Sequence, residues 1–297
     1  MKLGMVGVLR GHQFGSLRPF WSTSLTVNTQ SKLSARNGAT DISPPTQSNE
    51  VIEQLLDHRS VRAFTDQPLP DGTIETLVAA AQSASTSSNL QVWSVVAVQD
   101  VDRKKRLSGL AGNQAYIHQA PLFLVWLTDL SRVSRIAEEA GVELEALPYL
   151  ESLLLGTIDA ALAAQNAVVA LESLRLGSVY IGGIRNDIEG VENELGLPPQ
   201  VYPVFGLCVG YPSPDRPAKV KPRLPQQAVL HHETYTIAGE EGVLSEYDAR
   251  LGAFYQREGM NASDWSEQVI NRLRNVSSLH GREELLGELV RRGFGLR

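Results

Sequence analysis

The chain has 297 residues, 42% of them hydrophobic, and is long enough to bury a large core in one large domain or two smaller ones. Its net charge of −6 and its pI of about 5.6 exclude the basic face with which nucleic-acid-binding proteins neutralise phosphates. The single cysteine, Cys208, excludes an intrachain disulfide, and its apolar neighbours favour a buried small hydrophobe over a nucleophile.

The first 48 residues differ in composition from the rest of the chain. They contain Lys, Arg, Ser and Thr but no acidic residue before Asp41, which is typical of a transit peptide. No clear amphipathic helix is visible there, which favours a disordered extension or a start codon placed too early. We therefore predict a disordered extension over 1–48, with a transit peptide and organellar location as the alternative, and a cytoplasmic folded domain over 49–297.

The folded part begins with two predicted helices. Asn49 is a suitable cap for a short helix over 51–58, and a second helix follows Asp71 and ends at the Ser/Thr cluster 83–88. Apolar runs of strand length then alternate with helical patterns. The predicted strands are 92–98, 121–128, 178–181 and 202–209. The remaining predicted helices are 100–110, 132–145, 150–176, 187–195, 245–257, 264–276 and 282–292.

This order predicts an α/β or α+β sandwich, with helices on both faces of a mainly antiparallel or mixed sheet. The helix 150–176 is apolar nearly all round and should be buried on most sides, ending where Gly177 takes a left-handed conformation. Its Asp159 and Gln165 interrupt the run of about 18 apolar residues that a membrane span needs, so we expect no membrane insertion. The C-terminal segment 243–297 is predicted to be helical.

A first basic cluster follows the first predicted helix, at His58, Arg59, Ser60 and Arg62. The two arginines are three residues apart, close enough to reach one phosphate if the helical turn continues, and the serine adds a neutral donor. Spacing alone favours the alternative, a pair of solvated surface arginines.

A second basic cluster, Lys221-Pro-Arg223, lies in a proline-rich segment. Side chains alternate along an extended chain, and we therefore expect this pair not to form one patch without a turn. Taken alone, each basic cluster is more typical of solvent-exposed surface residues than of a ligand-binding site. Two small basic groups beside Gly/Ser-rich loops in an acidic chain, however, are what a fold needs to bind one anionic cofactor.

Two further segments are suited to ligand binding. Gly182 and Gly183 end a strand, where they either allow the backbone to approach a planar ligand or simply form a tight turn. Ser85 and Ser87 lie in a polar loop between a helix and a strand. Neither a G-x-G-x-x-G fingerprint nor a P-loop is present, and no H-E-x-x-H, paired C-x-x-C or G-x-S-x-G pattern indicates a metal site or acyl transfer.

Taken together and in this order, the segments resemble the nitroreductase family of FMN proteins, in particular its oxygen-insensitive NADPH nitroreductase and flavin reductase branch. The resemblance is closest over 51–235. The matching blocks are HRSVR (58–62), SSNLQ (87–91), DAALAAQN (159–166), residues 177–186, FGLCVGYP (205–212) and KPRLP (221–225).

The resemblance implies an intertwined α+β homodimer with a central mixed sheet and two FMN sites at the subunit interface. The implied cofactor-binding residues are His58, Arg59, Ser60, Arg62, Lys221 and Arg223 around the ribityl and phosphate groups, Ser85, Ser87 and Gln114 at the pyrimidine edge, Gly182 and Gly183 near N5 and O4, and Arg185. Some of them would serve the partner's flavin. No catalytic side chain is expected, because the flavin carries the hydride.

The implied function is reduction of nitroaromatic or quinone compounds by NAD(P)H in a ping-pong, two-electron reaction. Two alternatives stay open: a flavin reductase that supplies free reduced flavin, and a non-catalytic flavin-binding regulatory module. Arg257 is the candidate for the NADPH 2′-phosphate, but the adjacent Glu258 would repel that group, so NADH is also a possible donor.

Overall fold

The computed structural model describes residues 27–37 and 48–297. Within them, four strands form one sheet in the order β1-β2-β4-β3. The strands are β1 (Trp93–Val98), β2 (Leu122–Asp129), β3 (Gly177–Ile181) and β4 (Val201–Gly210). The four predicted strands are therefore confirmed to within one residue at each end.

All three strand pairs are antiparallel, so the sheet itself is not mixed. The parallel contact found in the described chain is one isolated bridge between Ser60 and Ser178, in which the Val61 amide donates to the Ser178 carbonyl over 2.8 Å. Since β3 is the edge strand, this bridge attaches the first basic cluster to the edge of the sheet.

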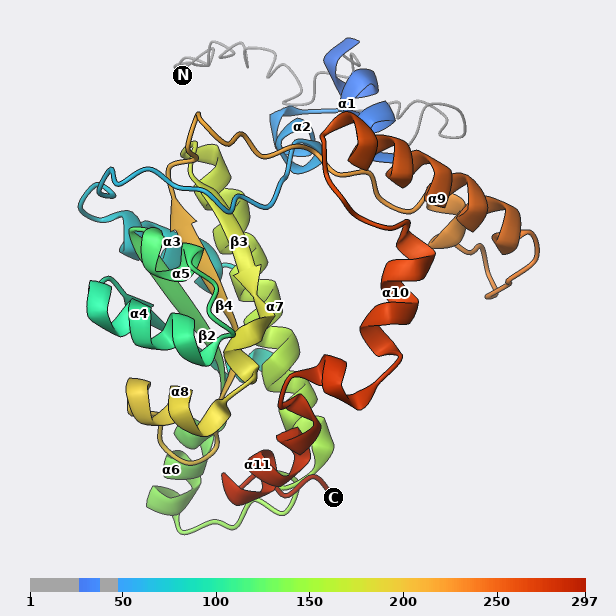
Figure 1. The fold of residues 1–297 in the computed structure, drawn as a ribbon. Helices are drawn as coiled ribbons and strands as arrows, with labels where there is room; N and C mark the ends of the chain where they lie inside the picture. The colour runs from blue at the N-terminus through green and yellow to red at the C-terminus, as the bar shows by residue number, and fades with distance from the viewer. Residues whose placement is uncertain (1–26, 38–47) are drawn as a thin grey trace, which may run out of the picture.

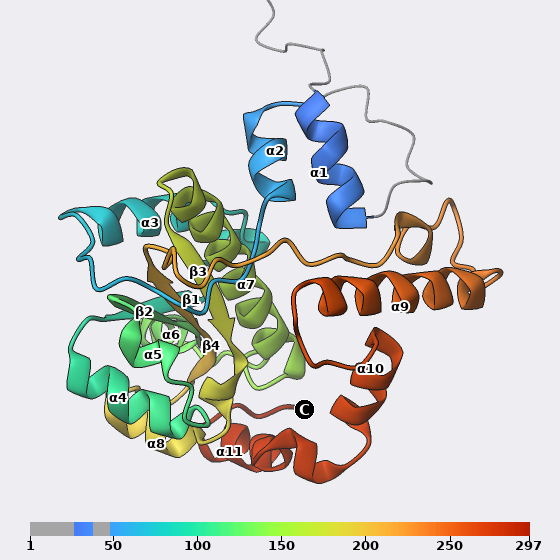
Figure 2. The ribbon, with the colours of Figure 1, turned by 45° about the horizontal axis from the view of Figure 1, so that its top comes forward.

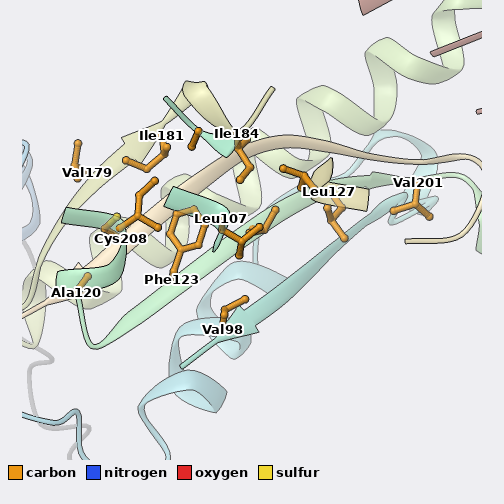
Figure 3. Packing of buried hydrophobic residues seen from close by; sticks show 14 residues of the cluster. Val98, Leu107, Ala120, Phe123, Leu127, Val179, Ile181, Ile184, Val201 and Cys208 are labelled. Atoms are coloured by element: carbon orange, nitrogen blue, oxygen red, sulfur yellow. The ribbon is translucent and has the colours of Figure 1, made fainter. Parts of the chain in front are cut away.

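Strand β2 is buried along its whole length because helices cover both faces of the sheet. Phe123, Val125 and Leu127 pack on one face, and Leu122, Leu124 and Trp126 on the other. The first face is covered by α4 (Val101–Leu110), α5 (Tyr116–Gln119) and α8 (Ile188–Leu195), and the second by α3 (Thr73–Gln82) and α7 (Leu150–Ser173). Figure 3 shows Cys208 beside Phe123 on the first face of the sheet. The predicted burial of Cys208 is therefore confirmed.

Several predicted helix bounds are wrong. The helices predicted over 245–257 and 264–276 run over Glu240–Arg257 and Trp265–Leu273. Helix α6 (Ser131–Ala140) ends five residues early, because Gly141 adopts a φ of 66°. Helix α7 ends before Arg175, whose φ of 62° provides the left-handed residue expected at Gly177. Gly177 instead begins β3, where an added Cβ would lie 2.5 Å from the Val61 Cγ2 atom, so the glycine is required by the close approach of the bridged segment.

Helix α7 is the long central helix of the fold (Figure 1). Its buried Asp159 carboxylate accepts hydrogen bonds from the backbone amides of Ser87 (3.2 Å) and Val92 (3.3 Å). By length and composition the helix could cross a membrane, with a mean hydropathy of 1.5 over 18 residues, yet 39% of that window is buried inside the protein. One face of α7 therefore belongs to the core, and another is left uncovered.

The predicted disordered extension is wrong for residues 27–37, which form helix α1 (Val27–Asn37). Helix α1 packs on α2 (Glu50–Leu56), as Figures 1 and 2 show. The Thr29 hydroxyl donates to Oε1 of Glu53 over 2.7 Å, and Nζ of Lys32 lies 3.1 Å from Oδ2 of Asp57. These polar contacts to distant residues stabilise a helix that has no apolar stripe for sequence analysis to detect. The rest of the extension, 1–26 and 38–47, lies outside the described residues.

The C-terminal helices form an arm that extends away from the sheet (Figures 1 and 2). It comprises α9 (Glu240–Arg257) and α10 (Trp265–Leu273), and α11 (Leu285–Arg291) then returns to the body, where Leu289 is buried. Helix α9 has a small core of its own, made of Tyr247, Leu251, Phe254 and Tyr255. The predicted helical segment is thus present but is not one compact unit.

Two glycines inside helices should respond in opposite ways to alanine. At Gly156 in α7, a Cβ would lie 2.3 Å from the Thr128 Cγ2 atom, whereas at Gly252 in α9 nothing lies within 4 Å. We expect Gly156→Ala to lower the free energy of unfolding by about 1–3 kcal/mol through overpacking. Gly252→Ala should raise it by about 0.5–1 kcal/mol through helix propensity. Denaturant titration measures both, and equal effects would contradict the packing seen at Gly156.

Candidate functional site

The two basic clusters of the sequence meet at one cavity of about 540 Å³. Seven cationic side chains line it, and no Asp or Glu occurs among the described residues of its wall. These side chains are Arg36, Arg59, Arg62, Arg216, Lys219, Lys221 and Arg223. In a chain with a net charge of −6, such a gathering produces a local positive potential suited to an anion.

The expectation that Lys221 and Arg223 do not share one patch is wrong, because both line this cavity. Alternation along an extended chain separates adjacent side chains, whereas residues two apart point to the same side. The intervening Pro222 is buried, and its carbonyl accepts a hydrogen bond from the Tyr247 hydroxyl over 3.1 Å. The proline thus anchors the segment while both cations face the cavity.

The first cluster reaches the cavity in a different way from that predicted. Helix α2 ends at Leu56, so Arg59 and Arg62 are not on a continuing helical turn. The backbone bridge to β3 holds this segment, with Val61 buried and both arginines exposed towards the cavity. The Nδ1 atom of His58 lies 2.6 Å from Oε1 of Glu172 on α7, so His58 ties the cluster to the central helix.

The arm supplies the opposite wall of the cavity through Phe254 and Met260. Lys221 connects to the arm as well: its Nζ donates to the Tyr255 hydroxyl over 3.0 Å and lies 5.0 Å from the centre of that ring. The cavity therefore combines cations from the body and from the proline-rich segment 216–223, called the crossing segment, with Phe254 of α9 and with Met260.

A second group of predicted site residues meets at η2 (Gly182–Arg185), the turn after β3. An added Cβ at Gly183 would lie 2.4 Å from Nε2 of Gln114 and 2.5 Å from the Ala111 carbonyl oxygen, whereas at Gly182 it would meet only the Arg185 guanidinium, at 3.6 Å. Gly183 is thus needed for internal packing, and Gly182 has space beside it. Arg185 itself donates to the Val204 carbonyl.

The loop with Ser85 and Ser87 does not reach the first basic cluster in the same chain. Both serines are exposed, and the Ser87 amide is held by Asp159, thirteen residues along α7 from the Glu172 that anchors the first cluster. At 1.5 Å per residue the two anchoring points are about 20 Å apart. One subunit therefore does not bring all the predicted site residues together.

Arg257 lies at the edge of the arm and is exposed. Its guanidinium lies 3.2 Å from the Glu258 carboxylate and 5.4 Å from the centre of the Phe254 ring. The same carboxylate is 3.8 Å from Lys219, which lines the cavity. Glu258 is therefore paired with two cations next to the anion site.

Three of the cationic cavity residues, Arg36, Arg216 and Lys219, were not among the predicted site residues. The last two lie in the same proline-rich segment as Lys221, and extending that cluster towards the N-terminus would have included them. Arg36 gave no signal, because it lies in the predicted disordered extension.

The residues present fit a phosphorylated cofactor better than nucleophilic chemistry. Burial raises the pKa of the Cys208 thiol far above its usual range, so no thiolate is available there. Guanidinium and ammonium groups in a wall whose described residues include no Asp or Glu, in contrast, are the donor set that a phosphate requires.

Comparison with known proteins agrees with this chemistry. Residues 55–211 match the nitroreductase family, and residues 221–297 match the nitroreductase family C-terminal domain. The FMN reductase (NADPH) of Bacillus subtilis is 44% identical over 75% of this chain and 91% of its own length. The oxygen-insensitive NADPH nitroreductase of Salmonella typhimurium is 43% identical over 73% of this chain and 88% of its own length.

The solved structure of the NfrA1 nitroreductase from B. subtilis superposes on this chain with a TM-score of 0.77. It is 41% identical, and the match covers 83% of this chain and 99% of that structure. The two family matches cover both the body and the arm, and the chain belongs to the nitroreductase family.

Proposed function

We propose that this protein is an NADPH-dependent oxidoreductase that binds FMN and reduces nitroaromatic or quinone compounds. The observation that carries the proposal is the cavity with seven cationic side chains and no carboxylate in its described wall. The names of the relatives support it, since they combine FMN with NADPH in one case and nitroreduction with NADPH in the other.

The phosphate of FMN would be held by Arg59, Arg62, Lys221 and Arg223, with Ser60 available to the ribityl chain. His58 contributes by fixing this segment to Glu172. Bound FMN supplies the hydride chemistry, and the side chains of this protein bind and orient it and keep the site positive. No acid–base triad is required, and a donor and an acceptor that share one pocket react in a ping-pong sequence.

A flavin reductase is the second candidate function, favoured by the relative named FMN reductase. It is distinguished by turnover of added FMN far above that of nitro compounds. A flavin-binding regulatory module would instead bind FMN tightly and not be reduced by either nicotinamide.

We propose NADPH as the preferred electron donor, with Arg257 as the contact for its 2′-phosphate. Glu258 is paired with Arg257 and Lys219, which reduces the repulsion expected from sequence alone. Donor preference then depends on whether Arg257 leaves its carboxylate partner when the 2′-phosphate is present, and comparison of the two nicotinamides measures that preference directly.

We further propose a homodimer, with α7 at the subunit interface. Leu150, Leu154, Ile158 and Leu162 recur every four residues on α7 and are 45–54% exposed, which forms an apolar stripe. We propose that a second copy of the chain covers this stripe, because the Ser85–Ser87 loop is anchored to Asp159 beside the stripe and lies far from the cavity of its own chain. Across such an interface, the loop can serve the flavin of the partner.

A cytoplasmic location for this dimer also remains a proposal. It is supported by the folded domain that matches the bacterial relatives over most of their length. Residues 1–26 lie outside the described part of the chain, and N-terminal sequencing of the mature protein would test the targeting alternative.

The central test is anaerobic reduction of the purified protein with NADPH and NADH in parallel. We expect a yellow protein that NADPH bleaches faster than NADH, and whose flavin absorbance nitrofurazone or menadione restores. A colourless protein that cannot be reconstituted with FMN would contradict the proposal.

The four cations Arg59, Arg62, Lys221 and Arg223 form the proposed phosphate clamp. Removing one of them should weaken FMN binding much more than riboflavin binding. For Arg62→Ala and Arg223→Ala we expect about a 10- to 100-fold loss of FMN affinity, the value of one hydrogen bond between charged groups. Riboflavin lacks the phosphate and should bind as it does to the wild type. Fluorescence titration measures both, with Arg103→Ala, on α4 outside the cavity, as the matched control. Equal losses for the two flavins would place the phosphate elsewhere.

The two glycines of η2 should separate packing from ligand contact. Gly183→Ala is expected to lower the free energy of unfolding by about 1–3 kcal/mol, since the clashing Ala111 carbonyl belongs to the backbone. Gly182→Ala should leave the stability of the apoprotein within about 0.5 kcal/mol of wild type. It should nevertheless weaken FMN binding about tenfold, because a methyl group would occupy the approach to the flavin. Unchanged FMN affinity in Gly182→Ala would remove Gly182 from the site.

An acidic residue on the α7 stripe should dissociate the dimer. Leu154→Asp is expected to shift sedimentation towards the monomer and to release FMN, whereas Ile136→Asp, at an exposed apolar position on α6, should do neither. A dimer that persists in Leu154→Asp would exclude α7 as the interface.

A further inference from the structure

Helix α1 lies outside the part of the chain that matches the family. The family matches begin at residue 55 and end at residue 297. The NfrA1 structure is matched over 99% of its length but covers only 83% of this chain. Helix α1, at Val27–Asn37, is thus an addition to the common fold, and it is seated beside α2 (Figure 2).

The last turn of α1 places one arginine between the two halves of the anion cavity. The side chain of Arg36 is buried, with only 7% of the residue exposed. Its Nη1 donates to the Lys221 carbonyl over 3.0 Å, and its Nη2 donates to the Leu56 carbonyl, also over 3.0 Å. The same Nη2 donates to the His58 carbonyl, and Nε donates to Leu56 over 3.3 Å.

The backbone of Arg36 adds a further link, because its carbonyl accepts a hydrogen bond from the Arg223 amide over 2.7 Å. One residue therefore joins the segment at Leu56 and His58 to the segment at Lys221 and Arg223, more than 160 residues away in sequence. The planar guanidinium suits this role, since its fixed fork of donors can serve carbonyls from two chain segments at once.

The charges around Arg36 make its buried position unfavourable without compensating contacts. Burial lowers the pKa of the Arg36 guanidinium, and the charge of Arg223 lowers it further, while Asp57 and Glu172 act in the opposite direction. Placing another cation beside Arg223 is unfavourable by itself. Its hydrogen bonds to three carbonyls offset that cost, and an anion in the cavity would offset it further.

We infer that Arg36 is a positioning residue for the cofactor phosphate, and that α1 is a strap, added to the family fold, that holds the two clamp segments at a fixed separation. The inference rests on the proposed function, because the anion that the clamp holds is taken to be the phosphate of FMN. Arg36 itself donates to backbone carbonyls and acts through Arg59, Arg62, Lys221 and Arg223.

The test measures the affinities of the full-length protein for FMN and for riboflavin in three variants. Arg36→Ala removes the fork and the charge, Arg36→Lys keeps the charge without the fork, and Arg103→Ala removes a surface arginine outside the cavity. Thermal unfolding of each apoprotein is recorded alongside, and Arg36→Lys serves as the test variant if Arg36→Ala does not fold.

We expect Arg36→Ala to lose FMN affinity at least tenfold with little change in riboflavin affinity, Arg36→Lys to show an intermediate loss, and Arg103→Ala to match the wild type. A merely structural role would lower the melting temperature and weaken both flavins equally, which would overturn the inference. Unchanged FMN affinity in both Arg36 variants would overturn it as well. In either case the proposed function stands as long as the wild type binds FMN, whereas a wild type that binds no FMN refutes the proposed function itself.

Discussion

Like charges repel, so the fold must supply the free energy that holds seven cationic side chains around one cavity. It does so through the backbone. The bridge between Ser60 and Ser178 attaches the first cluster to the edge strand β3, and Gly177 permits the close approach that this bridge requires. On the other side, Pro222 is buried while its two neighbours face the cavity. An anion bound in the cavity would relieve the repulsion, so anion binding would stabilise the fold.

The parts of the fold that sequence analysis located accurately are those dominated by local patterns. The four strands are short apolar runs bounded by turn residues, and burial on both faces of β2 leaves little freedom in where that strand begins and ends. Helix α1 was missed because its stability comes from contacts with α2 and the crossing segment rather than from an apolar stripe. The left-handed conformation was assigned to Gly177 instead of Arg175 for a related reason, since the close approach of Val61 to Gly177 is a tertiary contact that local sequence does not show.

The candidate site was harder to predict because its parts are distant in sequence. Arg62 and Lys221 meet only once the chain has passed through the whole sheet, and no local spacing encodes that encounter. The resemblance included both basic clusters. It did not show that Gly183 packs closely against Gln114, or that the serine loop lies far from the basic clusters. These outcomes depend on packing and on association, which a single sequence does not specify.

The order of the strands has a consequence for how the protein is made. Among the strands of the described residues, β3 pairs with β4 alone, and β4 separates β3 from β2. The sheet therefore has no place for its edge strand until residues near 210 have been synthesised. The first basic cluster, made far earlier, must wait for that edge before it can dock, and the second cluster leaves the ribosome later still. Such long-range pairing makes folding slow. In a growing chain, then, the cationic cavity is among the last features to form, because part of its wall is synthesised after the whole sheet.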